Sequence, residues 1–210
     1  MSRVARILRA VASNATAQGR VRIPIRLDTF LATVEVPALL ADRTRALLTD
    51  EIRADSSPLG ALVEVDEGGR VSMDGRRWDP GVDQTVFDQL VYVLLQASLD
   101  ADADRLHLHA GYVSLRGRGV LIGGFAGSGK STLVARLVED GFDYHTDERV
   151  AVDESLRLGP LPKAVSLVAG SFSALRRADP DRAGAGVSSS RLWHVPASAL
   201  RSGSVGNEGH

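Results

Sequence analysis

The sequence contains no cysteine and no long apolar stretch. The absence of cysteine excludes disulfides, thiolate catalysis and zinc sites with cysteine ligands. The longest apolar run, residues 90–95, is far too short to span a bilayer. Residues 3–11 place arginines among apolar residues, yet they lack the long apolar core and cleavage site of a signal peptide. We expect a solvated segment there rather than a membrane-surface helix, and a cytoplasmic protein without membrane contact.

An excess of positive charge is also absent. The formal net charge is −1, from 25 basic and 26 acidic residues, so no basic field would recruit nucleic acid or anionic membrane. Lysine occurs only at Lys130 and Lys163, and every other basic residue is an arginine. A length of 210 residues, of which 44% are hydrophobic, suits one domain with a small appendage.

The spacing of apolar residues divides the chain. We expect a β-rich N-terminal lobe over residues 1–82, an α/β core over residues 83–200 and a polar tail over residues 201–210, disordered from residue 202. Expected strands lie at residues 21–27, 32–36, 61–65, 70–73, 105–109, 111–115, 119–122, 142–145, 150–152, 164–168 and 192–195. Expected helices lie at residues 37–48, 83–100, 131–140 and 170–175, and residues 178–190 are expected to form a loop.

Residues 124–131, GFAGSGKS, match the phosphate-loop pattern G-x-x-x-x-G-K-[ST]. The apolar run at residues 120–122, which we interpret as a buried strand, precedes the loop, and an amphipathic helix pattern follows it. Glycines let the backbone wrap around phosphates because no Cβ intrudes. Inward-pointing amides and the positive end of the following helix then hold the anion. The pattern predicts binding of a nucleoside triphosphate, ATP with Mg²⁺, and the alternative is a glycine-rich turn without a ligand.

Within this pattern, Lys130 would reach the β- and γ-phosphates, and the Ser131 hydroxyl would ligate Mg²⁺. The predicted nucleotide contacts are Gly124, Gly127, Ser128, Gly129, Lys130, Ser131 and Thr132.

An acidic pair, Asp147-Glu148, follows the next predicted strand. The distance from Lys130 fits a helix, a turn and a strand, which would return the two carboxylates to the phosphate loop. Such carboxylates would ligate Mg²⁺, directly or through water, and one would accept a proton from a hydroxyl. The alternative is a solvated acidic turn.

Two histidines share a face of the strand before Gly111, because His107 and His109 are two residues apart. A hairpin would bring His109 back beside the phosphate loop. A structural role is the plainer interpretation of a histidine at a strand end, and no third ligand accompanies the pair for a metal. Lys163 is interpreted as a surface lysine, with contact to phosphate or acceptor as the alternative.

The last predicted strand is interpreted as packed, and the alternative is an acceptor surface. The residues that would line that surface are Arg191, Trp193 and His194.

Residues 109–148 resemble the HPr kinase/phosphorylase family and its smaller P-loop relatives. The resemblance lies in His109 at the head of a hairpin, the phosphate loop, the helix after it and the Asp147-Glu148 pair. Residues 162–167 resemble a segment of the smaller relatives. The family implies a P-loop kinase core of the HPr kinase/phosphoenolpyruvate carboxykinase-like type, here with a β-rich N-terminal lobe. Its members phosphorylate serine on a small protein, some relatives phosphorylate ribosomal peptide precursors, and many form homo-oligomers.

Carried over by position, the resemblance implies that Asp147 is the general base and also faces the metal. Glu148 would be the metal-side carboxylate, and His109 would lie near the γ-phosphate or assist proton movement. The implied catalytic residues are thus Asp147, His109 and Lys130, and the implied metal ligands are Ser131, Asp147 and Glu148.

The expected function is that of a P-loop serine kinase whose partner is a protein or peptide with an acceptor serine. Two alternatives stay open. One is a kinase for small-molecule hydroxyls on the same fold, and the other is a nucleotide-binding regulatory module without catalysis.

Overall fold

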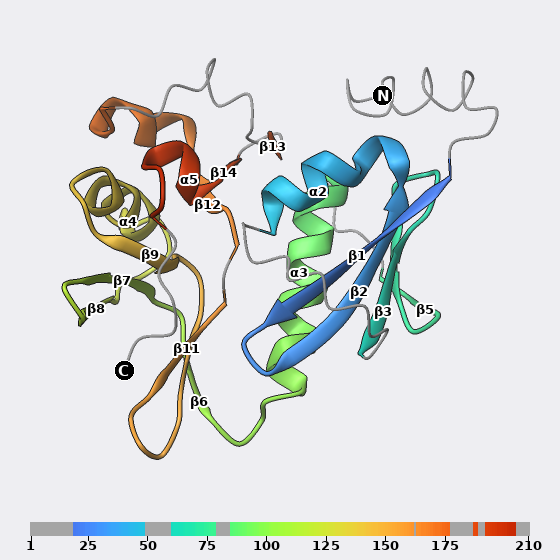
Figure 1. Ribbon diagram of the computed structural model, residues 1–210, viewed down its shortest axis with the longest axis horizontal. Coiled ribbons are helices and arrows are strands. Elements are labelled where there is room, and N and C mark those ends of the chain that lie inside the picture. The colour runs from blue at the N-terminus through green and yellow to red at the C-terminus, as the bar shows by residue number, and fades with distance from the viewer. Residues whose placement is uncertain are drawn as a thin grey trace.

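The computed structural model describes residues 19–48, 60–78, 85–161, 163–176, 187–188 and 192–204. Helices and strands are mixed, and the strands form several small sheets. An N-terminal half, built on one five-stranded sheet, lies beside a second half that carries the phosphate loop (Figure 1). Among the described residues, no helix has the length and apolar character needed to cross a membrane.

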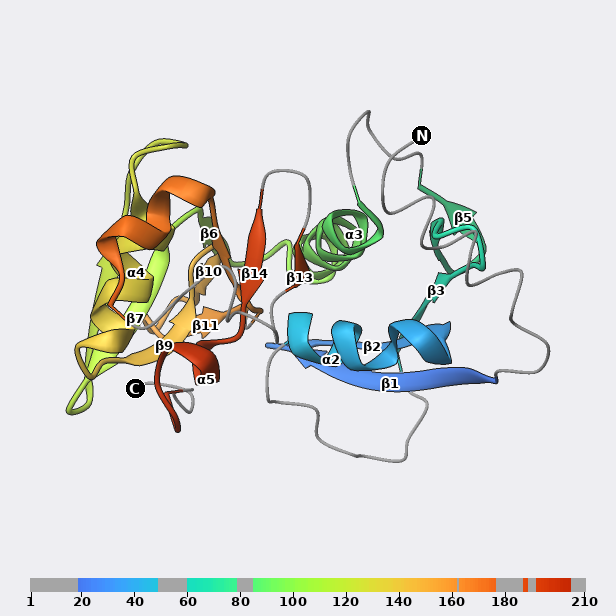
Figure 2. The ribbon, with the colours of Figure 1, turned by 90° about the horizontal axis from the view of Figure 1, so that it is seen from above.

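The N-terminal half is one sheet with helices on one side. The strands pair in the order β1-β2-β3-β4-β5, with β2 and β3 parallel and the other neighbours antiparallel. The strands are β1 (Arg20–Leu27), β2 (Phe30–Pro37), β3 (Ala61–Val65), β4 (Val71–Met73) and β5 (Arg76–Arg77). The helices are η1 (Ala38–Leu40), α2 (Ala41–Leu47) and α3 (Val86–Asp100). Both α2 and α3 lie on the same side of β1 and β2 (Figure 2).

Alternation along the strands builds the core of this half. In β1 every second residue, Ile23, Ile25 and Leu27, is buried, as expected for a strand with one covered face. Leu90 and Val93 of α3 belong to the same apolar cluster. The core of the N-terminal half therefore extends past residue 82. It includes α3, although the predicted division places this helix in the α/β core of residues 83–200.

A capping box starts α3. The Thr85 side chain accepts a hydrogen bond from the backbone N–H of Asp88, and the Asp88 carboxylate accepts one from the backbone N–H of Thr85. Two donors that the helix leaves unpaired at its start are thereby satisfied. The helix begins at Val86, three residues later than the apolar spacing predicts.

The second half holds three small sheets, ordered β8-β7-β9, β11-β10-β6 and β12-β14-β13. Its strands are β6 (Leu106–Leu108), β7 (Gly111–Leu115), β8 (Arg118–Ile122), β9 (Asp143–Thr146), β10 (Val150–Val152), β11 (Leu158–Pro160), β12 (Val165–Leu167), β13 (Val187–Ser188) and β14 (Trp193–Val195). Its helices are α4 (Lys130–Glu139), η2 (Ala169–Ala174) and α5 (Ala197–Leu200).

Close packing of α4 on β7 organises this half. Val134 and Val138 of α4 share a buried cluster with Val113 of β7 and Tyr144 of β9. At Gly111 an added Cβ would lie 2.5 Å from a methyl group of Val134, so the approach of helix to strand requires glycine.

The predicted burial of residues 120–122 is wrong. Within the described part of the chain, β8 pairs only with β7 and is therefore an outer strand of its sheet. Val120 and Leu121 are 42% and 43% exposed. An apolar run of three residues is compatible with a central or an edge strand, because the number of neighbours depends on the rest of the fold.

The predicted disorder of the tail is wrong for its first residues. Ser204 is fully buried, and its carbonyl accepts a hydrogen bond of 2.5 Å from the backbone N–H of Tyr144. Residues 205–210 and 3–11 lie outside the described residues. The predicted loop at residues 178–190 contains the two-residue strand β13, and its other residues are also outside the description.

Candidate functional site

The central strand β7 brings three predicted site segments to one edge of the sheet. It runs antiparallel to both β8 and β9, with Gly111 opposite Ile122 and Tyr112 opposite Thr146. The end of β8, the start of β7 and the end of β9 therefore share an edge. The phosphate loop, His109 and the Asp147-Glu148 pair leave the sheet at this edge.

Glycine geometry shapes the phosphate loop. Gly127 and Gly129 have positive φ angles of 77° and 90°, which other residues adopt at a cost. A Cβ at Gly124 would lie 2.6 Å from Ser128 Oγ, so a side chain there would fill the cradle. The loop has the backbone freedom that wrapping around a phosphate requires.

Lys130 closes the loop from the first position of α4. Its Nζ donates to the carbonyl oxygens of Gly124 and Phe125 at 2.8 and 3.1 Å, and the residue is 7% exposed. The positive end of α4 adds to the same field. The ammonium is thus already at the loop, where phosphate oxygens would compete with the two carbonyls for it.

The next two hydroxyls have different partners. The Ser131 side chain is one of the groups that lower the pKa of Asp147, so the predicted metal-binding hydroxyl lies near the predicted acid. The hydroxyl of Thr132 lies 2.8 Å from Ser171 Oγ of η2. Thr132, a predicted nucleotide contact, therefore has its side chain engaged with η2.

Asp147 is fully enclosed by hydrogen-bond donors. Its side chain is 0% exposed, and the ammonium of Lys163 lies 2.7 Å from Oδ1. Oδ1 also accepts from the Tyr144 hydroxyl at 3.2 Å, and Oδ2 accepts from the backbone N–H of Ser166 at 3.0 Å. Burial raises the pKa of this carboxyl, but the Lys163 charge and these hydrogen bonds outweigh burial and hold the pKa below its ordinary value. Asp147 is therefore an ionised, buried acid.

The interpretation of Lys163 as a surface lysine is wrong, since it is 2% exposed. Its three N–H groups donate to Asp147 Oδ1, to Ser166 Oγ at 2.9 Å and to the Ala164 carbonyl at 3.2 Å. A buried ammonium is tolerated only when it is paired and hydrogen-bonded, and here both conditions hold.

Glu148 and His109 form the more accessible side of the site. Their side chains are 30% and 55% exposed. His109 Nδ1 lies 2.9 Å from the Glu148 carbonyl oxygen, and since a carbonyl only accepts, Nδ1 carries the hydrogen. Glu148 Oε1 lies 3.5 Å from His109 Nδ1, and its Oε2 lies 3.8 Å from Lys163 Nζ. Glu148 thus stands between an exposed imidazole and the buried ammonium.

His107 does not join the site. Its Nε2 donates to the Asp102 carbonyl at 2.6 Å, and its Nδ1 accepts from Arg149 at 3.2 Å. The two histidines of this strand therefore have separate partners. In the part of the chain that the structure describes, no group of three or more histidine and acidic side chains could hold a metal by itself. Magnesium at this site would take its remaining ligands from phosphate and water.

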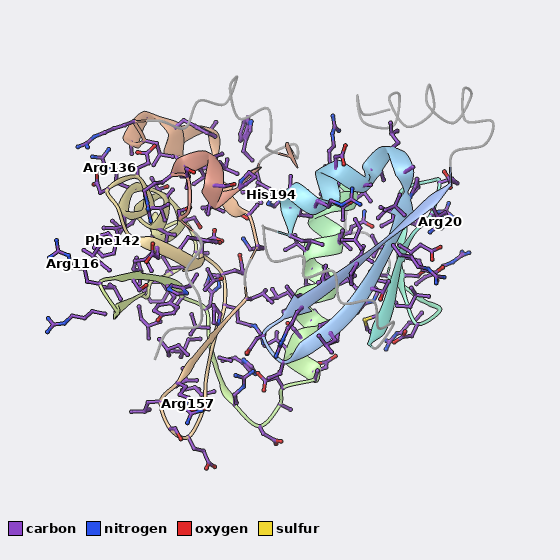
Figure 3. The ribbon with its side chains drawn as sticks, in the orientation of Figure 1. Arg20, Arg116, Arg136, Phe142, Arg157 and His194 are labelled. Carbon is purple, nitrogen blue, oxygen red and sulfur yellow. The ribbon has the colours of Figure 1, made fainter. Side chains whose placement is uncertain are left out.

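The packed interpretation of the last strand is confirmed for two residues. His194 is 2% exposed and lies between the two halves (Figure 3). The Trp193 ring meets Phe172 edge-on, with centroids 5.7 Å apart. Arg191 lies outside the described residues.

Three residues around Asp147 were missed in the sequence: Lys163 as its partner, Ser166 and Tyr144. The scarcity of lysine was the available signal for the first of them. Ser166 is 19 residues from Asp147, so its contact depends on β9 and β12 lying together. Tyr144 is only three residues from Asp147, but no pattern of the sequence marked it.

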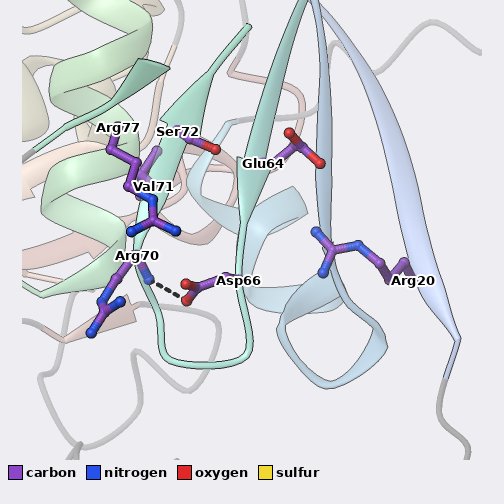
Figure 4. Close-up of a pocket in the computed structure, with 7 residues that line it drawn as sticks. All are labelled: Arg20, Glu64, Asp66, Arg70, Val71, Ser72 and Arg77. Carbon is purple, nitrogen blue, oxygen red and sulfur yellow. Dashed lines mark hydrogen bonds between the residues drawn. The ribbon is translucent and has the colours of Figure 1, made fainter. Parts of the chain in front are cut away.

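A separate cavity of about 170 Å³ lies on the N-terminal sheet (Figure 4). Three arginines and two acids dominate its lining, and Asp66 Oδ1 accepts a hydrogen bond of 2.9 Å from the backbone N–H of Arg70. Its lining residues are Arg20, Glu64, Asp66, Arg70, Val71, Ser72 and Arg77. None of these residues belongs to the phosphate loop or its partners.

Comparisons of the chain with protein-family models, with curated proteins and with solved structures found no match.

Proposed function

We propose that this chain binds ATP with Mg²⁺ and transfers the γ-phosphoryl group to a serine hydroxyl of a protein or peptide. The observation that carries the proposal is the meeting of the phosphate loop, His109 and an acidic pair at one sheet edge. A loop of this shape binds phosphate, and an acid and a hydroxyl beside it supply what a magnesium nucleotide and a phosphoryl acceptor require.

The phosphates would be held by the loop amides, by the start of α4 and by Lys130. On binding, the Lys130 ammonium would exchange the carbonyls of Gly124 and Phe125 for phosphate oxygens. The Ser131 hydroxyl would be a magnesium ligand, and Asp147 would orient it. When bound, Mg²⁺ supplies positive charge that neutralises the phosphates during transfer.

The exposure of the two acidic side chains favours Glu148 over Asp147 as the proton acceptor. The resemblance implies Asp147, but that carboxylate is 0% exposed and already accepts hydrogen bonds from the Lys163 ammonium and the backbone N–H of Ser166. Glu148 is the acid with accessible surface. We therefore give Glu148 the role of general base and Asp147 the role of ordering the magnesium-side hydroxyl.

These roles describe a balanced transfer of the γ-phosphoryl group from ATP to serine. The serine oxygen attacks the γ-phosphorus in line, the bond between the γ-phosphorus and the oxygen bridging to the β-phosphate breaks, and ADP leaves. The serine proton passes to Glu148, whose side chain is 30% exposed and can release it to solvent. Positioning and charge neutralisation supply most of the catalysis.

The test is transfer of phosphate by purified protein, with MgATP and a library of serine peptides and hydroxyl metabolites, read by mass spectrometry. Lys130→Ala is expected to lose nucleotide binding. Glu148→Gln is expected to bind MgATP and lose transfer. Undiminished MgATP binding by Lys130→Ala would remove the phosphate-loop assignment, and retained transfer by Glu148→Gln would return the base role to Asp147.

The library also separates the alternatives. Phosphate found only on a metabolite would identify a small-molecule kinase. Nucleotide binding with no phosphorylated product would favour the regulatory module.

A further inference from the structure

A line of hydrogen bonds leaves the candidate site at Lys163. The Nζ donates to Ser166 Oγ at 2.9 Å, and an ammonium has no acceptor. Ser166 Oγ is therefore the acceptor in this bond, and its own O–H is free to donate. His194 Nδ1 lies 3.3 Å from Ser166 Oγ.

The line continues through the imidazole. His194 Nε2 lies 3.1 Å from Asp88 Oδ1, and because a carboxylate only accepts, Nε2 carries the hydrogen of the neutral ring. Nδ1 then accepts from the Ser166 hydroxyl. Each donor from Lys163 to Asp88 then points in the same direction along the line. At 2% exposure, His194 has almost no access to water that would substitute for either partner.

The line ends on the other half of the molecule. Asp88 is the acid of the capping box that starts α3, and its Oδ2 accepts from the backbone N–H and the hydroxyl of Thr85. The apolar face of α3 belongs to the core of the N-terminal half. His194 therefore joins the surroundings of the phosphate loop to the head of a helix that is 106 residues away in sequence.

Two acids lie near the Lys163 ammonium, at unequal distances. Its ammonium lies 2.7 Å from Asp147 and 3.8 Å from Glu148, so two acids compete for one cation. Ser166 Oγ accepts another hydrogen of the same ammonium at 2.9 Å. A tight pair between Lys163 and Glu148 would engage the carboxylate that must remain free to accept a proton.

We propose that His194 is a positioning residue of the nucleotide site, which through Ser166 keeps Lys163 on Asp147 and leaves Glu148 free. Asp88 fixes His194 from the N-terminal half. This inference rests on the proposed function for its consequence in catalysis, whereas the positioning itself is measurable without any substrate.

The composition offers a direct probe, because Lys130 and Lys163 are the only lysines. Protein labelled with ¹⁵N at lysine Nζ has two side-chain signals, which Lys130→Arg assigns. The Lys163 signal is expected to show ammonium hydrogens that exchange slowly with water. His194→Ala and Ser166→Ala are expected to shift this signal and to speed its exchange by about tenfold or more, because a hydrogen bond of the charged ammonium is weakened or lost. Ser166→Thr keeps the hydroxyl and is therefore expected to give a Lys163 signal close to that of the unaltered protein.

His107→Ala is the matched control, because it removes an internally bonded histidine that has no link to Lys163. An unchanged Lys163 signal in His194→Ala, or an equal change in His107→Ala, would overturn the positioning role. If His194→Ala fails to fold, Asp88→Asn provides the second variant. It keeps the shape of the side chain, replaces the carboxylate by an amide and must alter the Lys163 signal.

The Lys130 signal reports the nucleotide in the same spectra. His194→Ala is expected to keep its MgATP affinity within a few-fold and to lose about ten- to a hundredfold in kcat, with KM for ATP unchanged. Equal loss of affinity and rate would contradict the proposal. If the unaltered protein shows no response of Lys130 to MgATP, the proposed function fails, while the Lys163 signal still decides whether His194 positions it.

Discussion

The ammonium of Lys163 and the carboxylate of Asp147 lie 2.7 Å apart, and the two side chains are 2% and 0% exposed. The second lysine of the chain thus sits at the acid that the sequence places after β9, with the first, Lys130, at the phosphate loop. Both lysines belong to one region of the structure. Because this buried pair lies in the core and also in the candidate site, loss of the contact is expected to affect both the stability of the fold and the geometry of the site.

Replacing Lys163 by methionine is expected to destabilise the protein by about 3–5 kcal/mol, because Asp147 is left as an uncompensated buried charge. Urea unfolding measures this. The double variant Lys163→Met/Asp147→Leu is expected to recover much of the loss, since it removes both charges. A double variant no more stable than Lys163→Met would contradict the pairing. Arg45→Met, which breaks an exposed pair with Asp42, should change little and serves as the control.

Stability is expected to depend on pH through Asp147. The pKa of its carboxyl in the folded protein is below the ordinary value of 3.8, so the unfolded chain binds this proton more readily. The contribution to stability is complete above pH 3.8, decreases as the pH falls below 3.8 and is lost once the pH is below the folded pKa. Unfolding curves recorded between about pH 5 and pH 2 check this. The Lys163→Met/Asp147→Leu variant should show a flatter dependence, and an equally steep one would count against it.

Gly124→Ala is expected to lower the affinity for MgATP by tenfold or more, because a side chain at this position strains the backbone of the loop by roughly 1–3 kcal/mol. The new Cβ would lie 2.6 Å from Ser128 Oγ at a φ of 156°. Gly123→Ala is the neighbouring control, since a Cβ there meets no atom within 4 Å. Fluorescence titration with a labelled nucleotide compares them. Equal affinities for the two variants would show that the cradle at Gly124 does not contact phosphate.

Thr85→Ala is expected to cost about 1 kcal/mol of stability, because α3 loses its capping side chain. Thr85→Ser keeps the oxygen and should be close to neutral. Thermal unfolding compares the two variants. A neutral Thr85→Ala would mean that Asp88 starts the helix without its partner.

Local patterns in the sequence predicted the loop, the helix after it and most strands, because these depend on near neighbours along the chain. Gly129 and Lys130, for example, belong to one motif. The burial of Lys163 was not predictable in this way, since its partner Asp147 is 16 residues distant and meets it only when β9 and β12 come together. A lysine after a proline has the same local pattern whether it is exposed or buried.

Two other predictions, the burial of β8 and the disorder of the tail, are wrong for the same reason. Val120 and Leu121 are apolar enough for a central strand, but the number of strands beside β8 is a property of the whole sheet. Ser204 is polar and lies near the end of the chain, yet its backbone pairs with Tyr144. In both cases composition indicates the preference of a residue, and tertiary contacts decide the outcome.

The division of the apolar residues into separate clusters has a consequence for how the protein melts. Of the two tryptophans, Trp78 packs on the cluster of the N-terminal half and Trp193 on that of the phosphate-loop half. Variants that keep one tryptophan each would therefore report the loss of structure in one half by fluorescence. Coincident transitions would mean that the contacts through His194 join the halves into one cooperative unit, and separate transitions would mean that each half unfolds by itself.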